Sequence, residues 1–351
     1  IPLSERFNTE DNDLRYSKKI NNEDLIMSTT GKPISQKFID VLNRLDSKIN
    51  VKLEEVYQIP EIAEALIKAA DVPETINLPG RDKIREGAFN KLVANKGFAY
   101  KKDVLYNEDV RKDHKAFLVL GLPSSGKSSV ITDRLLKENN AFLLDSDEAK
   151  KIFKEYKNGL GAGAVHEESK IINERLTREI TSDGTNLVMP IVGSTKEKVE
   201  KIVNLLKASD YTVDIHLVEV DNTTSLSRLL KRYITGNRFL DPRLVFDYKN
   251  KPSEVFEEVK GEAHEYSKWS NEVAEGEQPI LKDTSSSREA KSYLQSSRQE
   301  GRRVSNKSDS GKTSEEIRKS IKVDWDTHSN YEVPARTYED TIFFLGTDEE
   351  I

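Results

Sequence analysis

The chain of 351 residues contains no cysteine, which excludes disulfide bonds, thiolate metal sites and cysteine nucleophiles. Long apolar runs are also missing, and none approaches the roughly 20 residues that a membrane-spanning helix needs. The N-terminus lacks the basic-then-apolar pattern of a secretion signal. We therefore expect a soluble, cytoplasmic protein with no membrane partner.

Hydrophobic residues are scarce and the charges nearly balance. Hydrophobic content is 36%, which is low for a fully globular chain and indicates that parts are rich in solvent-exposed residues. The chain has 55 basic and 61 acidic residues, a net charge of −6. This balance gives no electrostatic reason to expect nucleic acid as a partner.

One apolar run ends in a glycine-rich turn. Residues 116–120 read as a buried strand, and Gly121-Leu-Pro-Ser-Ser-Gly-Lys-Ser128 follows it directly. Gly121 and Gly126 let backbone N–H groups approach phosphate oxygens, and the helix expected after Gly126 points its positive end at the same anion. This order of strand, loop and helix predicts a phosphate-binding loop rather than an ordinary turn.

The loop residues predict a nucleotide site that takes ATP or GTP with Mg²⁺. Lys127 is expected to neutralise the β- and γ-phosphates, and the Ser128 hydroxyl to hold the metal ion. The predicted binding residues are Gly121, Leu122, Pro123, Ser124, Ser125, Gly126, Lys127, Ser128 and Ser129.

Short apolar strands alternate with helical patterns after residue 115. Strands are expected at 116–120, 141–144, 186–192 and 212–220, and helices at 128–137, 149–156, 167–182 and 196–209. This alternation predicts an α/β fold, a mostly parallel sheet flanked by helices, with ligands at the carboxyl ends of the strands.

The texture of the chain divides it into five parts. We predict a poorly ordered segment at 1–30, a helical region at 31–100, the catalytic domain at 101–285, a polar linker or solvated helix at 286–320, and a segment packing on the body at 321–351. The helical region has amphipathic repeats between residues 34 and 69. Packing against the catalytic domain is the simpler interpretation, and binding a partner or covering the site is the other.

Two carboxylates end the second strand. In Ala141-Phe-Leu-Leu-Asp-Ser-Asp147 they stand at alternate positions, beside the expected phosphate loop. Phosphoryl transfer to a hydroxyl needs a carboxylate that orients the acceptor and takes its proton. We assign Asp147 as this base. Asp145 is either a metal or substrate ligand or a cap of the following helix.

A basic helix follows the last core strand. Arg228 and Arg232 lie four residues apart on one face, and Arg238 and Arg243 come after Gly236. Guanidinium groups on such a helix can close over the phosphates as a lid and stabilise the transferring charge. A solvated basic face is the alternative.

Two further segments are candidates for acceptor binding. The glycines at 159–163 permit close approach of a ligand, and His166, Glu167, Glu168 and Ser169 follow them, either as substrate contacts or as caps of the next helix. Gly193 and Ser194 stand at the exit of the third strand and are available to line the pocket.

Taken together, these motifs resemble the zeta toxin family of phosphate-loop kinases, the toxin halves of toxin-antitoxin pairs. The resemblance covers about 116–247 and extends at most to Thr284. It rests on four segments, which are Gly121 to Ser128, Leu144 to Lys150, Val165 to Ser169, and the pair Arg232 and Arg238.

The resemblance implies an alcohol-group phosphotransferase, a UDP-N-acetylglucosamine kinase acting on the 3′-hydroxyl of the amino sugar, with a separate antitoxin as a possible partner. The family's catalytic aspartate matches Asp147, its loop lysine matches Lys127, and its lid arginines match Arg232 and Arg238, with Arg243 as a substitute for Arg238. Related effectors of the same fold phosphorylate NAD on its adenosine ribose, so a dinucleotide is the second substrate class.

Two other classes of protein remain open at this stage. Residues 217–221 end in Asp221 as strands of switch or mechanical NTPases do, although the usual Asp-Glu pair is missing. A nucleotide-binding regulatory scaffold is the other possibility, with the helices of 33–70 as its binding element.

Overall fold

The computed structural model describes residue 27 and residues 31–101, 109–236, 238–274, 277–304 and 322–323. The predicted disordered segment at 1–30 and the predicted packing segment at 321–351 therefore lie almost entirely outside the described residues. No helix among the described residues is both long and apolar enough to cross a membrane.

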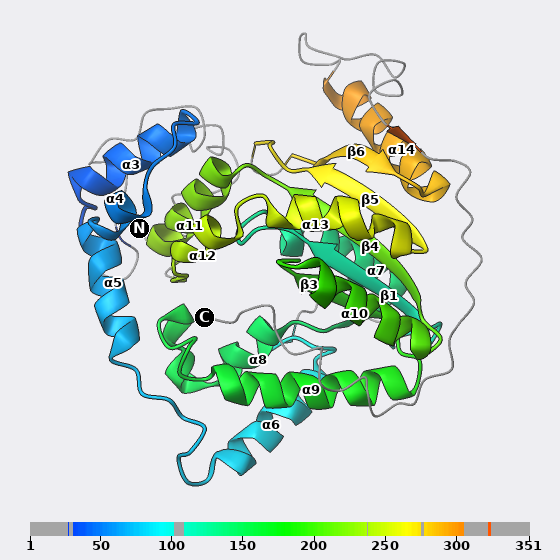
Figure 1. Ribbon diagram of the computed structural model, residues 1–351, viewed down its shortest axis with the longest axis horizontal. Helices are drawn as coiled ribbons and strands as arrows, with labels where there is room; N and C mark the ends of the chain where they lie inside the picture. The colour runs from blue at the N-terminus through cyan, green and yellow to red at the C-terminus, as the bar shows by residue number, and fades with distance from the viewer. Residues whose placement is uncertain are drawn as a thin grey trace.

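A mostly parallel sheet forms the centre of the molecule (Figure 1). Its strand order is β2-β3-β1-β4-β5-β6-β7, and only β6 runs antiparallel to its neighbour β5. The strands are β1 (Lys115–Leu120), β2 (Phe142–Leu143), β3 (Leu187–Ile191), β4 (Thr212–Glu219), β5 (Glu265–Ser270), β6 (Ile280–Thr284) and β7 (Lys322–Val323). The predicted fold class is confirmed.

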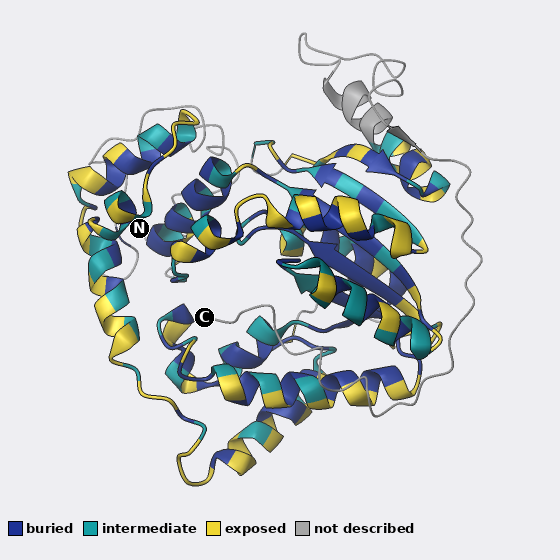
Figure 2. Cartoon of the chain, viewed as in Figure 1, coloured by how far each residue is buried: buried dark blue, intermediate teal, exposed yellow. Residues whose placement is uncertain are grey.

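Helices cover both faces of this sheet because successive side chains of a strand point to opposite sides. On β1, Leu118 and Leu120 join a core cluster with α10 (Lys196–Ala208) and α13 (Lys251–Val259). Phe117 and Val119 join a second cluster with α7 (Asp133–Asn139) and α14 (Ser287–Val304). The central strands are accordingly buried along their length (Figure 2).

A second group of helices lies beyond β2. The segment after β2 forms α8 (Ser146–Ile152), the 3₁₀ turns η2 (Lys154–Gly159) and α9 (His166–Ser182), and α6 (Arg81–Ala94) packs on α8 and α9. This group flanks the carboxyl end of β2, where the predicted Asp147 stands.

Three helices before residue 71 pack on the opposite flank. We call α3 (Gln36–Asp46), α4 (Leu53–Tyr57) and α5 (Pro60–Ala70) the N-terminal module. Their apolar faces share one buried cluster with α11 (Asn222–Gly236) and α12 (Arg243–Tyr248). The sequence predicted these helices, and the structure shows what their apolar face covers.

The carboxyl-terminal part differs from the sequence prediction. Strands β5 and β6 were not predicted as separate elements, and the polar stretch after residue 286 begins as helix α14. The first turns of α14 are packed rather than solvated, since Ala290 and Glu289 are buried and Tyr293 lies edge-on to Trp269. Residues 305–321 of the predicted linker lie outside the described residues.

Candidate active site

The phosphate loop follows β1 with the backbone shape that its glycines allow. Gly126 has a left-handed conformation (φ 93°), and a side chain there would collide with the Asn271 amide. A Cβ at Gly121 would stand 2.5 Å from the Val218 carbonyl oxygen. Only glycine fits both places, which leaves the loop amides open to a phosphate.

Two neighbouring elements hold the loop in shape. The Asn271 side chain donates to the Ser125 carbonyl at 2.7 Å, and the Ser225 hydroxyl donates to the Pro123 carbonyl at 2.6 Å. Within the loop, Lys127 Nζ donates to the carbonyls of Gly121 and Leu122. The ammonium group therefore already lies over the loop.

Three features of the loop fit a triphosphate with its metal ion. The hydroxyl of Ser125 is buried and has no hydrogen-bond partner among the described residues. Ser128 and Ser129 are exposed at the start of the π-helical turn η1 (Lys127–Thr132), which runs into α7, and Ser124 has a left-handed backbone (φ 57°). No group of three or more carboxylate or imidazole side chains among the described residues can hold a metal. Ser128 is thus the protein group placed for Mg²⁺.

Asp145 caps the helix that carries Asp147. Its carboxylate accepts from the Asp147 backbone N–H at 2.9 Å at the start of α8, so the capping alternative describes its contact here. Burial and the nearby charges of Asp147 and Glu148 raise the pKa of Asp145 to about 7. Asp145 therefore retains a proton well above the usual carboxyl range.

Both oxygens of Asp147 face cations. Oδ2 accepts from Arg238 at 2.7 Å, and Oδ1 lies 3.5 Å from the buried ammonium of Lys150, one turn along the same helix. Burial opposes ionisation, but Lys150 and Arg238 outweigh it and lower the pKa of Asp147. Asp147 is therefore the ionised member of the carboxylate pair at neutral pH.

The predicted lid arginines converge on Asp147. Arg238 bonds to it directly and also to the hydroxyl of Tyr156, and Asp147 raises the pKa of Arg238. Arg232 lies close to the same three groups on the exposed face of α11, and desolvation together with the charge of Arg238 lowers its pKa to about 10. Both arginines carry a positive charge near pH 7.

Arg243 lies elsewhere. Its guanidinium donates to the hydroxyl of Tyr57 in the N-terminal module, and its backbone N–H donates to the Asp241 carboxylate. It makes none of the contacts with Asp147 that Arg238 makes. The structure thus favours Arg238 as the second lid arginine.

One element connects the phosphate loop to Asp147. Ser225 near the start of α11 bonds to Pro123 in the loop, and the chain leaves α11 at Gly236 to place Arg238 on Asp147. The Phe239 N–H donates to the Asn158 carbonyl, which seats this exit on the segment after α8. Loop and carboxylate therefore flank the same helix, as the sequence predicted.

The residues predicted from 166 to 169 have different positions. His166 is half-buried near Lys150 and Asp147, and burial followed by the Lys150 charge lowers its pKa, so that it is neutral at pH 7. Glu167 is exposed, and the buried Ser169 hydroxyl donates to the His166 carbonyl as a helix contact.

Glu168 faces away from these groups. Its carboxylate is fully buried and accepts from Arg81, Arg85 and Thr75, three residues of α6 and the segment before it. These bonds give Glu168 a role in holding α6 on α9. We leave it out of the proposed substrate site.

Gly193 and Ser194 follow β3, between the phosphate loop and Asp147 in the strand order. Gly193 has a left-handed backbone (φ 74°), and a Cβ there would press on Leu120. Ser194 is 9% exposed. Both residues lie at the edge of the sheet where the sequence analysis expected them.

Sequence reasoning missed Tyr156, Lys150, Asn271 and Arg228. Tyr156 and Lys150 touch the charged groups around Asp147, whereas Arg228 donates to the carbonyls of Asn271 and Val273 and so fixes the residue that bonds to the phosphate loop. Lys150 was part of a quoted motif, and Arg228 was named only as a lid charge. Tyr156 and Asn271 carry no local signal.

A cavity of about 320 Å³ adjoins the phosphate loop at the carboxyl ends of β4 and β5. Its lining includes Gly121, Leu122, Asp221, Ser253 and Glu272. It lies on the side of the loop away from β2 and Asp147, since β1 separates β3 from β4 in the sheet.

Solved structures of similar shape come from toxin-antitoxin proteins and related complexes. The PezAT chromosomal toxin-antitoxin system of Streptococcus pneumoniae is 17% identical, with a TM-score of 0.44 over 57% of this chain and 81% of that chain. The AvrRxo1-ORF1:-ORF2 complex with ATP is 15% identical, with a TM-score of 0.42 over 62% of this chain and 72% of that chain. No curated protein sequence matches the chain.

The family comparison agrees with the site. Residues 100–268 match the model of the zeta toxin family, and this range contains the phosphate loop, Asp147 and both lid arginines. The chain therefore carries a domain of the zeta toxin family over residues 100–268.

Proposed function

We propose that the protein is an ATP- and Mg²⁺-dependent kinase that transfers the γ-phosphate to a hydroxyl of a nucleotide-linked metabolite. The supporting observation is that α11 contacts the phosphate loop through Ser225 and leads directly to Arg238 on Asp147. A phosphate held on the loop and an acceptor held by Asp147 would then meet beside the same two arginines. A cytoplasmic location is part of this proposal, because the substrates are cytoplasmic metabolites.

The residues of the loop would bind the donor. Backbone N–H groups between Gly121 and Ser128 and the ammonium of Lys127 would hold the β- and γ-phosphates. Mg²⁺, when bound, would neutralise phosphate charge, with the Ser128 hydroxyl as its protein ligand. Arg232 is placed to stabilise charge on the transferring group.

The contacts of Asp147 suggest an order of events. A carboxylate whose pKa is lowered is a weak proton acceptor, and Arg238 occupies the oxygen that an acceptor hydroxyl would need. In our proposal Arg238 shifts from Asp147 to the phosphate once the donor is bound. Oδ2 then accepts the proton of the hydroxyl while Lys150 keeps its place at Oδ1.

UDP-N-acetylglucosamine is the first candidate acceptor and NAD the second. The test is incubation of the purified protein with γ-labelled ATP and either metabolite, followed by separation of the labelled product. Label on the sugar nucleotide or the dinucleotide would support the corresponding substrate. Transfer to neither, with nucleotide binding intact, would defeat the substrate proposal.

Hydrolysis without an acceptor is the outcome that distinguishes a switch or mechanical NTPase. Asp221, the residue behind that alternative, is engaged by Lys48, Thr223 and Thr224. This contact set favours a structural role for it. A separate antitoxin is a possible partner, as expected of a toxin of this family, and a rise in toxicity when the protein is expressed alone in its host would support that assignment.

A further inference from the structure

Helix α11 is held from outside the zeta toxin domain. Its inward face, with Leu226, Leu229, Leu230, Tyr233 and Ile234, is buried in one cluster with Phe38, Leu42 and Leu45 of α3. Moving α11 as a rigid lid would expose this apolar surface on both partners. The helix is therefore fixed in place, although it carries a predicted lid arginine.

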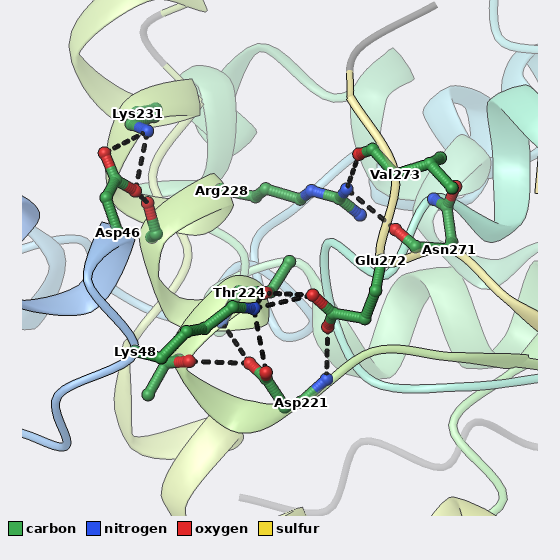
Figure 3. Close-up of polar contacts among 11 residues, drawn as sticks. Asp46, Lys48, Asp221, Thr224, Arg228, Lys231, Asn271, Glu272 and Val273 are labelled. Atoms are coloured by element: carbon green, nitrogen blue, oxygen red, sulfur yellow. Dashed lines mark hydrogen bonds and ion pairs between the residues drawn. The ribbon is translucent and has the colours of Figure 1, made fainter. Parts of the chain in front are cut away.

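Two polar residues at the end of α3 set the position of α11 along this cluster (Figure 3). Asp46 accepts from Lys231 at 2.8 and 2.7 Å and from the Ser227 hydroxyl at 2.6 Å, so it grips α11 over one turn. The Asp46 and Lys231 side chains are 18% and 14% exposed, which limits screening by water.

Lys48 reaches the start of the same helix. Its ammonium contacts Asp221, Thr224 and Glu272, three residues on the β4 end, on α11 and after β5. Asp221 in turn accepts from the Thr224 N–H and caps α11. Lys48 is half exposed, so we expect its contribution to be smaller than that of Asp46.

The other face of α11 meets the catalytic groups. Ser225 bonds to the phosphate loop, Arg228 bonds to the Asn271 backbone, and Arg232 lies beside Arg238 and Asp147. A shift of α11 by a fraction of a turn would move all three contacts together. Misplacement of about 1 Å is enough to lower a rate by about 10²-fold.

We propose that Asp46 and Lys48 are positioning residues for the phosphotransfer, which fix α11 so that Arg232 stays beside Asp147 while only the segment after Gly236 moves. This inference rests on the proposed function for its catalytic readout. It assigns the N-terminal module a part in the active site although the module touches no reacting atom.

The first test compares Asp46→Asn and Lys48→Met with Arg44→Met. Arg44 pairs with Glu55 inside the module, so its loss matches the loss of an ion pair without touching α11. We expect Asp46→Asn to lower kcat about tenfold with less than a twofold change in the KM for ATP, because the misplaced arginine acts in the transition state. Lys48→Met should show a smaller loss in kcat, and Arg44→Met none. Unchanged kcat in Asp46→Asn, or an equal loss in Arg44→Met, would overturn the proposal.

Charge exchange provides a second variant. Asp46→Lys and Lys231→Asp should each lower kcat more than tenfold, and the double variant should return to within about threefold of the wild type. A double variant no better than either single one would contradict positioning by this pair.

Hydrogen exchange separates this inference from the proposed function. In Asp46→Asn the amides of 222–236 should exchange about tenfold faster, while those of α9 stay as in the wild type. This result would support the inference even if the wild type transferred phosphate to no acceptor. Unchanged exchange in α11, or faster exchange throughout the protein, would overturn it.

Discussion

At the scale of single residues, the chemistry depends on how Asp147 and Asp145 divide their charge. Two carboxylates two positions apart repel each other, and each can take a different state when their surroundings differ. Lys150 and Arg238 flank Asp147 and favour its ionised form, whereas Asp145 is buried beside that charge and stays protonated to about pH 7. One residue is thereby available as a base while the other serves the helix.

Asp147→Asn should lower kcat by at least about 10³-fold with ATP affinity unchanged. The amide keeps the shape of the side chain but takes no proton from the acceptor, and it does not touch the phosphate loop. Single-turnover transfer from labelled ATP and titration with a fluorescent ATP analogue measure the two quantities. Turnover within tenfold of the wild type would remove Asp147 from the mechanism.

Asp145→Asn should stabilise the protein at high pH. The folded-state pKa of about 7 lies above the ordinary 3.8, so the folded protein holds this proton more tightly, and the wild type loses stability as pH rises from about 4 to 7. Asparagine still caps a helix and has no proton to lose. We expect a gain of about 1 to 2 kcal/mol at pH 8 that disappears toward pH 4, in urea unfolding at both pH values. An equal gain at both would show that the ionisation of Asp145 is not its cause.

The sequence identified the residues that belong to a local pattern and missed those that reach the site through space. The phosphate loop and Asp147 stand directly after strands, so their positions follow from the strand pattern. Tyr156 and Asn271 each make a decisive contact, with Arg238 and with the Ser125 carbonyl, from segments whose sequence is unremarkable. Such contacts depend on tertiary packing, which no local spacing records.

At the scale of elements, the exit of α11 decides which arginine serves the site. Gly236 ends the helix, and the next described residues turn toward the segment after α8, where Phe239 bonds to Asn158. This seat places Arg238 on Asp147, and α12 then carries Arg243 away to Tyr57.

Arg238→Met should therefore lower kcat by about 10²-fold or more, and Arg243→Met by less than about threefold. The first variant removes a cation from the transferring charge, and the second removes an exposed contact with the N-terminal module. Steady-state kinetics on the two purified variants makes the comparison. The reverse ranking would transfer the lid role to Arg243.

The central strands were predictable because parallel strands are buried on both faces and read as apolar runs. β5 and β6 were not, since β5 pairs with an antiparallel partner near the edge of the sheet and alternates polar with buried residues. Helix α14 was taken for a linker or solvated helix because its sequence is mostly polar, yet Glu289 is buried through its ion pair with Arg134.

At the scale of the whole molecule, the N-terminal region contacts both flanks of the site. The module packs on α11, Thr75 bonds to the Ala164 carbonyl in the glycine-rich segment, and α6 packs on α8 and α9. Amphipathic patterns predicted the helices but not these partners, because periodicity shows that a face is apolar and not what covers it. The proposed domain boundaries stay a prediction.

Deletion of the residues before Asp71 should give an insoluble or unfolded protein rather than a hyperactive one. The apolar face of α11 would be left without its cover, and Phe38 alone is fully buried. Solubility and circular dichroism of the truncated protein test this, with Phe38→Ala as a milder variant expected to cost about 3 to 5 kcal/mol. A soluble truncation with higher activity would show instead that the module inhibits the site.

The pairing of α3 with α11 also affects how the protein is made. Asp46 must wait for a partner 185 residues further along the chain, and Leu42 and Leu45 wait for the same helix. At about 5 to 20 residues per second, a ribosome needs roughly 10 to 40 seconds to supply it. During that time the first apolar helices to emerge have no native surface to cover them, so the nascent chain is a natural client for a chaperone.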